Sequence, residues 1–225
     1  MKGRENTVTG KTVNFRGIND YSLRQLFKGI IRIYGEQHWW PAESPLQVIE
    51  GAILTQNTSW KNVERALINL KGLSSRDLLK MSPGDLQSLI RPAGFFKNKE
   101  KSLRSLLSYF DGTLESGSIP LNLRDELLEL RGVGKETADS IALYAFNSLT
   151  FPVDSYTIRF LNRFFGANLT MNDYEHLRSL FMRCFQKSEL MEIHGLIDEH
   201  SKRICRKVPD CSSCQLRTDC MYFNG

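Results

Sequence analysis

The stretch LLELRGVGKETAD, residues 127–139, places a glycine turn between two runs that have the helical spacing of apolar residues. Gly132 and Gly134 let the backbone turn tightly and approach a partner closely. We predict a second helix that begins at Gly134 or Lys135, with its free N–H groups and positive dipole end facing outward. Such a helix start suits a phosphate group, and Lys135 adds positive charge to it. An ordinary helical hairpin that binds nothing would show the same pattern.

Helical spacing continues on both sides of this turn. Apolar residues recur every three or four positions, which is the spacing of one buried helix face. The clearest runs lie at 23–34, 63–70, 103–110, 138–145, 160–164 and 177–184. No segment alternates cleanly with period two, so we predict an all-α protein of about nine or ten helices. Residues 1–20 show no clear period, and we expect a loosely held arm there.

The composition is that of an ordinary globular protein. The chain has 225 residues, is 41% hydrophobic and carries a net charge of +5, with a pI near 9.0. This length allows one large domain or two small ones. The positive charge suits a polyanionic partner without requiring one. No apolar run approaches the roughly 20 residues of a membrane span, so we expect a soluble intracellular protein.

An acidic residue opens the next helical run after the hairpin. The segment FPVDSYTIR, residues 151–159, is a short proline-containing loop that leads into a helix with Asp154 at its start. Aspartate at such a position is often a plain N-cap. The chain has a Leu-x-Gly-Val-Gly-x-x-Thr-Ala hairpin, followed by a Gly/Pro-rich loop and then Val-Asp. This order of parts resembles the HhH-GPD superfamily of DNA glycosylases. The resemblance runs from about Pro45 to Cys220 and implies an enzyme that flips a damaged base out of duplex DNA.

The resemblance gives Asp154 the catalytic role. Cleavage of an N-glycosidic bond develops positive charge on the sugar, so a fixed carboxylate stabilises the transition state and can orient or deprotonate water. Lyase members of the family read Gly-Val-Gly-x-Lys-Thr-Ala, and the lysine amine attacks the sugar. Glu136 stands at that place here, and a carboxylate cannot form an imine. Lys135 is rotated by about 100° on the helix. We therefore predict a monofunctional glycosylase that leaves the abasic site uncut.

All three tryptophans of the chain fall in the segments HWWP, residues 38–41, and LTQNTSW, residues 54–60. A single tryptophan is more often a core residue than a ligand-binding one. These segments, together with IRPAGFF at 90–96, resemble the 3-methyladenine DNA glycosylase III branch of the superfamily. That resemblance implies a flat base pocket made of Trp39, Trp40, Pro41, Trp60 and Glu136.

Such a pocket suits an alkylated purine. A base methylated at N3 or N7 carries positive charge, so aromatic ring faces attract it, and it leaves without a strong general acid. An aromatic pocket also accepts hypoxanthine, ethenoadenine or other lesions.

Two further side chains are expected to hold the DNA open. By resemblance to endonuclease III, Gln56 would fill the gap left by the flipped nucleotide and Phe95 would wedge into the opposite strand. A glutamine on a helix face and a buried phenylalanine are the alternatives. Lys97, Lys99, Lys101 and Arg104 follow and would track phosphates or form a solvated helix face. The remaining predicted DNA contacts are Gly132, Gly134, Lys135, Lys202, Arg203 and Arg206.

Four cysteines, Cys205, Cys211, Cys214 and Cys220, are spaced C-x5-C-x2-C-x5-C. This bunching is typical of a metal-ligand cluster in a reducing compartment rather than of scattered disulfides. Zinc and an iron–sulfur cluster are both chemically possible. Many endonuclease III relatives end in a C-x6-C-x2-C-x5-C loop that holds a [4Fe-4S] cluster, so the resemblance implies that cofactor, with the first gap one residue shorter here. Cys184, on an apolar stripe, is expected to be a buried structural thiol.

The resemblance also predicts how the chain is organised. We expect one helical subdomain at residues 25–150, which contains the hairpin, and a second that combines residues 1–24 with residues 151–225. We expect a cytoplasmic, nucleoid-associated monomer that acts on double-stranded DNA with a damaged base and has no membrane contact. Two alternatives stay open: an endonuclease III-like glycosylase with AP lyase activity on other lesions, and a non-catalytic protein that binds DNA through the hairpin and the basic loop.

Overall fold

The computed structural model describes residues 15–112, 114 and 119–225, and in these residues the fold is helical, with no strand beyond one isolated bridge between Phe15 and Ile18. The all-α prediction is therefore confirmed. Most of the arm expected over residues 1–20 lies outside the described residues. Its last part is not loose, because Ile18 is fully buried. None of the described helices is both long and apolar enough to cross a membrane.

The helices follow one another along the whole described chain. The first part of the chain forms α1 (Asp20–Tyr34), α2 (Pro45–Leu54), α3 (Trp60–Leu70), α4 (Ser75–Lys80), α5 (Pro83–Ile90), η1 (Arg91–Ala93) and α6 (Phe96–Tyr109). The second part forms α8 (Leu123–Leu128), α9 (Lys135–Ser140), η2 (Ile141–Ala145), α10 (Ser155–Phe165), η3 (Met171–Asp173), α11 (Tyr174–Cys184), α12 (Lys187–Arg203), η4 (Arg217–Asp219) and α13 (Met221–Asn224). The described residues thus hold 12 α-helices, more than expected, because α4, α8 and α13 have only four to six residues and are too short to show an apolar period.

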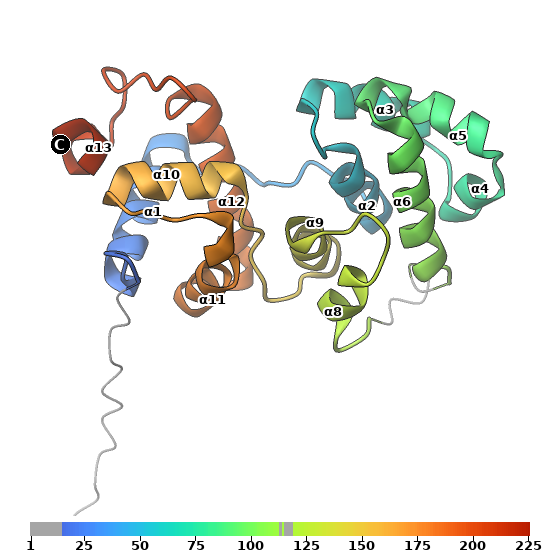
Figure 1. Cartoon of the computed structure of the whole chain (residues 1–225), viewed down its shortest axis with the longest axis horizontal. Helices are drawn as coiled ribbons and strands as arrows, with labels where there is room; N and C mark the ends of the chain where they lie inside the picture. Colours follow the sequence, from blue (N-terminus) through green and yellow to red (C-terminus); the bar gives the residue numbers. More distant parts are fainter. Residues whose placement is uncertain (1–14, 113, 115–118) are drawn as a thin grey trace, which may run out of the picture.

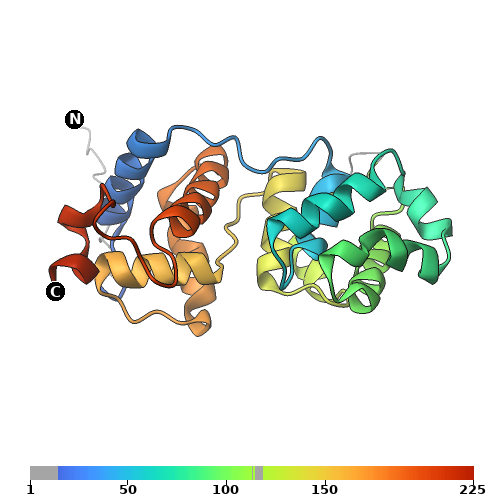
Figure 2. The same cartoon turned by 90° about the horizontal axis from the view of Figure 1, so that it is seen from above.

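Two separate hydrophobic cores divide the molecule into two lobes, which Figures 1 and 2 show side by side. The hairpin lobe has its core between residues 49 and 142, from α2 to the start of η2. The terminal lobe buries α1 against α10, α11 and α12. Its core also includes Cys184, which is fully buried as expected.

The boundary expected between residues 24 and 25 is wrong, because it falls inside α1. Leu23, Leu26, Phe27 and Ile30 form one apolar stripe on this helix, and all four belong to the core of the terminal lobe. A boundary within the helix would divide this stripe between two cores. The whole stripe is instead buried in one core, so α1 belongs entirely to the terminal lobe. The chain instead crosses to the hairpin lobe between the end of α1 and the start of α2.

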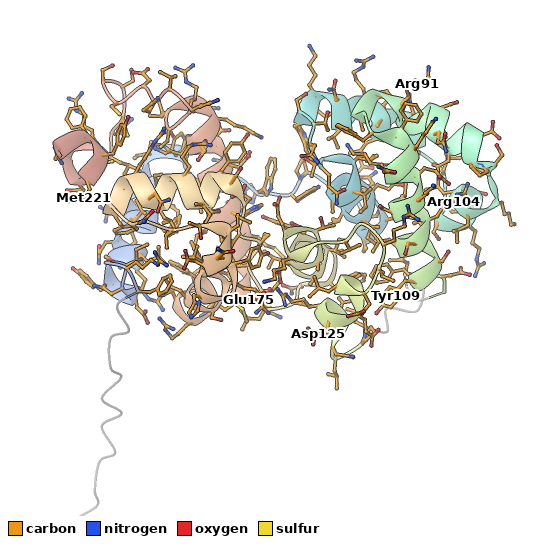
Figure 3. The ribbon with its side chains drawn as sticks, viewed as in Figure 1. Arg91, Arg104, Tyr109, Asp125, Glu175 and Met221 are labelled. Atoms are coloured by element: carbon orange, nitrogen blue, oxygen red, sulfur yellow. The ribbon has the colours of Figure 1, made fainter. Side chains whose placement is uncertain are left out.

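A buried carboxylate ties the two lobes together. Asp139 on α9 has no exposed surface, and its Oδ1 accepts hydrogen bonds from Nε of Arg124 at 2.7 Å and Nε of Arg178 at 3.1 Å. Its Oδ2 accepts a hydrogen bond from the Tyr174 hydroxyl at 2.7 Å. Arg124 lies on α8, whereas Tyr174 and Arg178 lie on α11 of the other lobe. Glu175, at the lobe boundary in Figure 3, pairs with both arginines from outside.

Candidate active site

A cleft of about 780 Å³ lies between the lobes. The segment from α2 to the start of α3, together with α9, lines one side, and the start of α10 with one face of α12 lines the other. The cleft brings together side chains that are far apart in the sequence. The predicted site residues that line it are Trp39, Trp40, Gln56, Trp60, Glu136, Asp154 and Lys202.

Asp154 is the N-cap of α10 and also faces the cleft. Its Oδ1 accepts two hydrogen bonds from Thr157, one from the backbone N–H and one from the hydroxyl, both at 2.7 Å. Within the described residues no hydrogen bond engages Oδ2. Because capping occupies one carboxylate oxygen, the other remains available to a water or a sugar in the cleft. The capping role and the predicted catalytic role are therefore compatible.

Glu136 shares this cleft from the first turn of α9. Its side chain is open to the cleft, but protein atoms surround it closely enough for desolvation to raise its pKa. The Asp154 carboxylate raises it further, to about 7. A carboxyl group and a carboxylate can therefore coexist here near neutral pH, because the two carboxylates repel each other when both are charged.

This shift predicts a pH-dependent effect of Glu136→Gln on stability. Glu136 has an ordinary pKa of 4.5 and a raised pKa of about 7 in the folded protein. The stability that this group contributes is therefore present below the lower value and is lost as the pH rises through the upper one. Glutamine does not ionise, so the Tm of the variant should rise relative to that of the wild type between about pH 5 and about pH 8. Thermal unfolding at both pH values measures this; a Tm difference that stays constant would contradict it.

The three tryptophans pack against one another and form an aromatic wall. The ring centroid of Trp60 lies 5.7 Å from that of Trp39 and 5.4 Å from that of Trp40. The rings of Trp60 and Trp40 pack edge to face. Two glycines make room for the wall. A Cβ on Gly195 of α12 would lie 2.6 Å from Cβ of Trp39, and one on Gly51 of α2 would lie 3.0 Å from Cζ2 of Trp40. The wall therefore rests on both lobes.

Sequence reasoning missed His194 and Asp198, which line the cleft, and Tyr144, which contacts His194 beside the cleft. The Tyr144 hydroxyl lies 2.7 Å from Nδ1 of His194, and desolvation raises the pKa of the tyrosine well above its ordinary value and lowers that of the histidine. His194, Asp198 and Lys202 recur every fourth residue on α12 and all line the cleft. That spacing was the available signal, because it places three polar side chains on one helix face. Tyr144 gave no such signal.

Three buried nitrogens at this site have no hydrogen-bond partner among the residues that the structure describes. They are Nε1 of Trp39, Nε1 of Trp40 and Nε2 of His194. All three residues line the cleft. Since buried polar groups are normally paired, these nitrogens are candidates for contacts with a bound molecule.

The glycine turn lies beside Gln56. The Gln56 side-chain amide donates hydrogen bonds to the Gly132 carbonyl and to the Thr137 hydroxyl, both at 3.0 Å. Gly132 has φ +76°, and a Cβ there would lie 2.0 Å from Oγ of Ser102, so a larger residue does not fit. Gly134 is the N-cap of α9, which confirms the predicted start of that helix.

Several predicted residues lie outside the cleft lining. Pro41 is exposed and is not part of the aromatic wall, because a tight turn, in which Ala42 N–H donates to the Trp40 carbonyl at 2.9 Å, leads the chain away. Phe95 is 68% exposed, so the alternative of a buried phenylalanine is wrong. Arg206 is exposed as well.

The lysines and arginines expected to reach phosphates differ in their surroundings. Lys135 lies 3.3 Å from Glu175, Lys202 lies 2.7 Å from Asp198, and Arg203 pairs with Glu199. These pairs are partly exposed, so a phosphate can compete for the cations. Within the basic run after Phe95, neither Lys99 nor Arg104 lies on a solvated face.

Arg104, on α6 in Figure 3, donates to the carbonyls of Leu79 at 2.8 Å and Met81 at 2.7 Å. Lys99 is only 3% exposed. Both side chains donate hydrogen bonds to backbone carbonyls of neighbouring segments. The sequence does not reveal these contacts.

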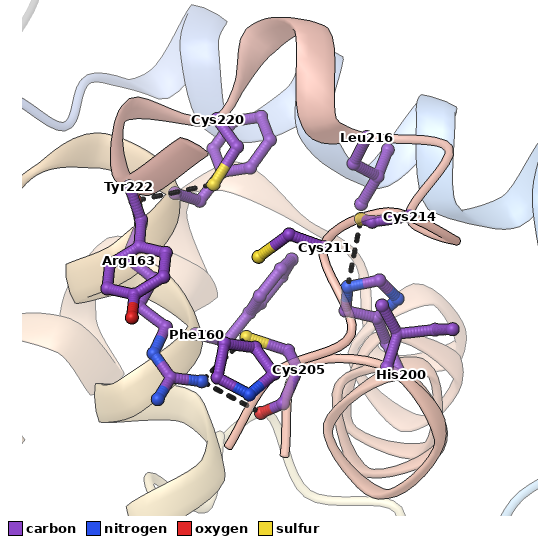
Figure 4. Close-up of a pocket in the computed structure, with 12 residues that line it drawn as sticks. Phe160, Arg163, His200, Cys205, Cys211, Cys214, Leu216, Cys220 and Tyr222 are labelled. Atoms are coloured by element: carbon purple, nitrogen blue, oxygen red, sulfur yellow. Dashed lines mark hydrogen bonds between the residues drawn. The ribbon is translucent and has the colours of Figure 1, made fainter. Parts of the chain in front are cut away.

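The four clustered cysteines line one pocket of the terminal lobe, as Figure 4 shows. The pocket wall is mostly apolar, and Arg163 and His200 approach the sulfurs. Nη1 of Arg163 lies 3.4 Å from Sγ of Cys205, and Nε2 of His200 lies 3.9 Å from Sγ of Cys214. The arginine N–H near the Cys205 sulfur suits a thiolate ligand, because it stabilises negative charge on the sulfur.

The two candidate metal groups place their thiolate ligands differently. Among the described residues, no three His, Cys, Asp or Glu side chains converge closely enough to hold a single metal ion. Four thiolates on one tetrahedral zinc would lie about 3.8 Å apart, given zinc–sulfur bonds of about 2.3 Å. In a [4Fe-4S] cluster each thiolate binds a different iron, so the sulfurs stand farther apart around a shared centre. The four thiols line one pocket and could ligate a metal group there.

Known proteins resemble this chain in sequence and in fold. Residues 51–187 match the family described as "HhH-GPD superfamily base excision DNA repair protein". A Methanocaldococcus jannaschii protein named "Putative DNA repair glycosylase MJ1434" is 42% identical over 211 residues, which cover 88% of this chain and 96% of that protein.

Two solved structures share most of the fold. An endonuclease III in non-covalent complex with DNA superposes with a TM-score of 0.77 at 21% identity, over 92% of this chain and 97% of that one. The 3-methyladenine DNA glycosylase of H. pylori, bound to 1,N6-ethenoadenine, superposes with a TM-score of 0.65 at 25% identity, over 83% of this chain and 98% of that one.

Proposed function

Because the chain belongs to the HhH-GPD superfamily of base excision DNA repair proteins, and is a DNA glycosylase of that family, we propose that it is monofunctional and removes an alkylated purine from duplex DNA. The observation that carries this proposal is the composition of the cleft. It combines a carboxylate with one free oxygen, a glutamate at the place of the lyase lysine, and an aromatic wall. A protein that only binds DNA has no need of these groups.

The reaction uses Asp154 beside the sugar of the flipped nucleotide. As the bond between C1′ and the base nitrogen breaks, its electron pair goes to the base and positive charge develops on the sugar, where the Asp154 carboxylate stabilises it. A water held by Oδ2 attacks C1′ and passes its proton to this carboxylate. Thr157 fixes the other oxygen through two hydrogen bonds, so that the carboxylate keeps its orientation throughout.

The aromatic wall and the charge of the cleft favour a cationic base. A purine methylated at N3 or N7 is attracted by the indole faces of Trp39, Trp40 and Trp60 and by the Asp154 carboxylate. Its departure yields a neutral base, so no strong general acid is required. The H. pylori 3-methyladenine DNA glycosylase, which covers most of this chain in the superposition, supports this choice of substrate class.

The amines near the cleft support hydrolysis without strand cleavage. Glu136 occupies the place of the lyase lysine, and Lys135 pairs with Glu175. Among the described residues that line the cleft, Lys202 is the one lysine. Its Nζ lies 2.7 Å from an Asp198 oxygen, so this amine is engaged in an ion pair.

Incubation with lesion-containing duplexes tests the proposal. Duplexes with 3-methyladenine, 7-methylguanine, hypoxanthine, uracil or thymine glycol are analysed with and without hot alkali. We expect strand breaks at the alkylated purines only after alkali. Breaks without alkali, together with covalent trapping by borohydride, would instead establish the lyase. Base release confined to uracil or thymine glycol would overturn the substrate class, and no release from any duplex would leave a protein that only binds DNA.

We propose further that Cys205, Cys211, Cys214 and Cys220 hold a [4Fe-4S] cluster. The cluster would fix the shape of the basic loop that carries Arg206, and hydrolysis of a glycosidic bond transfers no electrons. Cys211→Ala should lose the metal, whereas Cys184→Ala, which alters a buried thiol outside the pocket, should keep it. Elemental analysis should find about four irons per chain in the wild type and in the control. One zinc per chain would contradict the assignment.

A further inference from the structure

A buried ammonium lies behind the two loops that carry Gln56 and Phe95. Lys99, near the start of α6, is 3% exposed, and its Nζ donates hydrogen bonds to the carbonyls of Leu54 and Ala93, both at 2.8 Å. Burial lowers the pKa of Lys99 to about 8, so the ammonium form still predominates at neutral pH. Burial of a charge is costly unless hydrogen bonds satisfy it, and these two bonds do so.

The two carbonyls occupy equivalent places in the chain. Leu54 is the last residue of α2, and Ala93 is the last residue of η1. Carbonyls at the end of a helix carry partial negative charge and lack a partner within the helix, so they are good acceptors for an ammonium. Gln56 follows the first carbonyl by two residues, and Phe95 follows the second by two residues. One amino group therefore ties together the backbones of both loops.

Each loop already presents its side chain in a defined way. Gln56 is held against the hairpin by hydrogen bonds to Gly132 and Thr137. Phe95 has a left-handed backbone, with φ +46°, and is largely exposed. An exposed aromatic ring on a constrained backbone suits insertion into a base stack. The distance between the two side chains then depends on what fixes their backbones relative to each other.

We propose that Lys99 is a positioning residue for the opening of the duplex, because its ammonium fixes the spacing between the Gln56 and Phe95 loops. This inference rests on the proposed function and on the DNA-opening roles that the family resemblance implies for Gln56 and Phe95. With the loops held in advance, both side chains enter the duplex in one binding event. Without the ammonium, two inward-facing carbonyls lose their partner, and each loop must be ordered separately when DNA binds.

The test is a mutant cycle built on Lys99→Met, which keeps the length of the side chain and removes its donors. The probe is a duplex with a tetrahydrofuran abasic-site analogue opposite 2-aminopurine, whose fluorescence rises when the base is unstacked. This readout needs neither base release nor a particular lesion, so it stays informative even if the proposed substrate is wrong. We expect Lys99→Met to reduce the fluorescence rise and to slow base release by about 10- to 100-fold, the loss typical of a slightly misplaced group.

The cycle separates positioning from a merely structural role. In a Gln56→Ala/Phe95→Ala background, Lys99→Met should have little further effect, because residues that act together are not additive. Lys97→Met is the matched control. It removes an exposed lysine of the same helix, and we expect it to change DNA affinity without coupling to Gln56 or Phe95. Equal losses from Lys99→Met in the wild-type and the double-variant backgrounds would overturn the proposal.

A second variant covers the case in which Lys99→Met does not fold. Lys99→Gln keeps an amide that can donate hydrogen bonds, and it should restore part of the fluorescence rise. Thermal unfolding is measured for each variant. A Lys99→Gln protein of wild-type Tm that shows the same coupling would support the positioning role. If Lys99→Gln changed the 2-aminopurine fluorescence equally with and without Gln56 and Phe95, this result would refute it.

Discussion

Asp154→Asn is expected to slow base release by about 10²- to 10³-fold, the loss typical when one preorganised electrostatic partner of a transition state is removed. The substitution deletes the negative charge and keeps the shape of the side chain. Asparagine is as good an N-cap as aspartate, so the hydrogen bonds from Thr157 to Oδ1 can persist and α10 should begin unchanged. Single-turnover base release from a duplex containing the alkylated purine measures the effect.

A second substitution controls for the charge of the cleft. Asp198→Asn also removes one carboxylate from the cleft lining, but this carboxylate pairs with Lys202 instead of facing the sugar. We expect a much smaller loss of rate than for Asp154→Asn, and DNA affinity close to that of the wild type for both variants. If Asp154→Asn released the base at the wild-type rate, Asp154 would be a capping residue only. If both variants lost activity equally, general cleft charge would explain the effect.

The hairpin and the acidic N-cap could be predicted because each is a local pattern. Gly132 and Gly134 specify the turn through backbone conformation, and Asp154 at a helix start follows from the proline-containing loop before it. The positions of Trp39 and Trp60 in one cleft could be expected only through the resemblance to a family. Local sequence does not say that residues 39 and 154 line the same cleft, since two helical lobes must first pack.

What the sequence did not reveal depends on tertiary contacts. Lys99 follows Phe95 in a run of basic residues that looks like a solvated face, yet its ammonium is buried against carbonyls from two other segments. Tyr144 lies within the helical run at 138–145 but off its apolar stripe, and only the packing of α12 brings His194 within hydrogen-bond distance of its hydroxyl. Pro41 follows two cleft residues directly, but one tight turn removes it from the lining.

Asp139→Asn is expected to destabilise the protein by about 3–5 kcal/mol, because removal of this carboxylate leaves two largely buried arginines with only the partly exposed Glu175 to balance their charge. Asparagine has nearly the same volume as aspartate, so no cavity contributes to the loss. Its amide has one acceptor oxygen in place of two, whereas Arg124, Arg178 and Tyr174 all donate to the carboxylate. The expected destabilisation is therefore electrostatic, and it acts where α8 and α9 meet α11 of the other lobe.

Urea unfolding followed by tryptophan fluorescence measures this change, since all three tryptophans line the cleft between the lobes. Asp111→Ala is the matched control. It removes an exposed carboxylate whose oxygen lies 3.9 Å from Nε of Arg76, and exposed pairs of this kind contribute at most about 1 kcal/mol. A loss for Asp139→Asn no larger than that of the control would show that solvent reaches the network. A large loss with reduced base release at full saturation with DNA would show that the same carboxylate also sets how the two lobes face each other across the cleft.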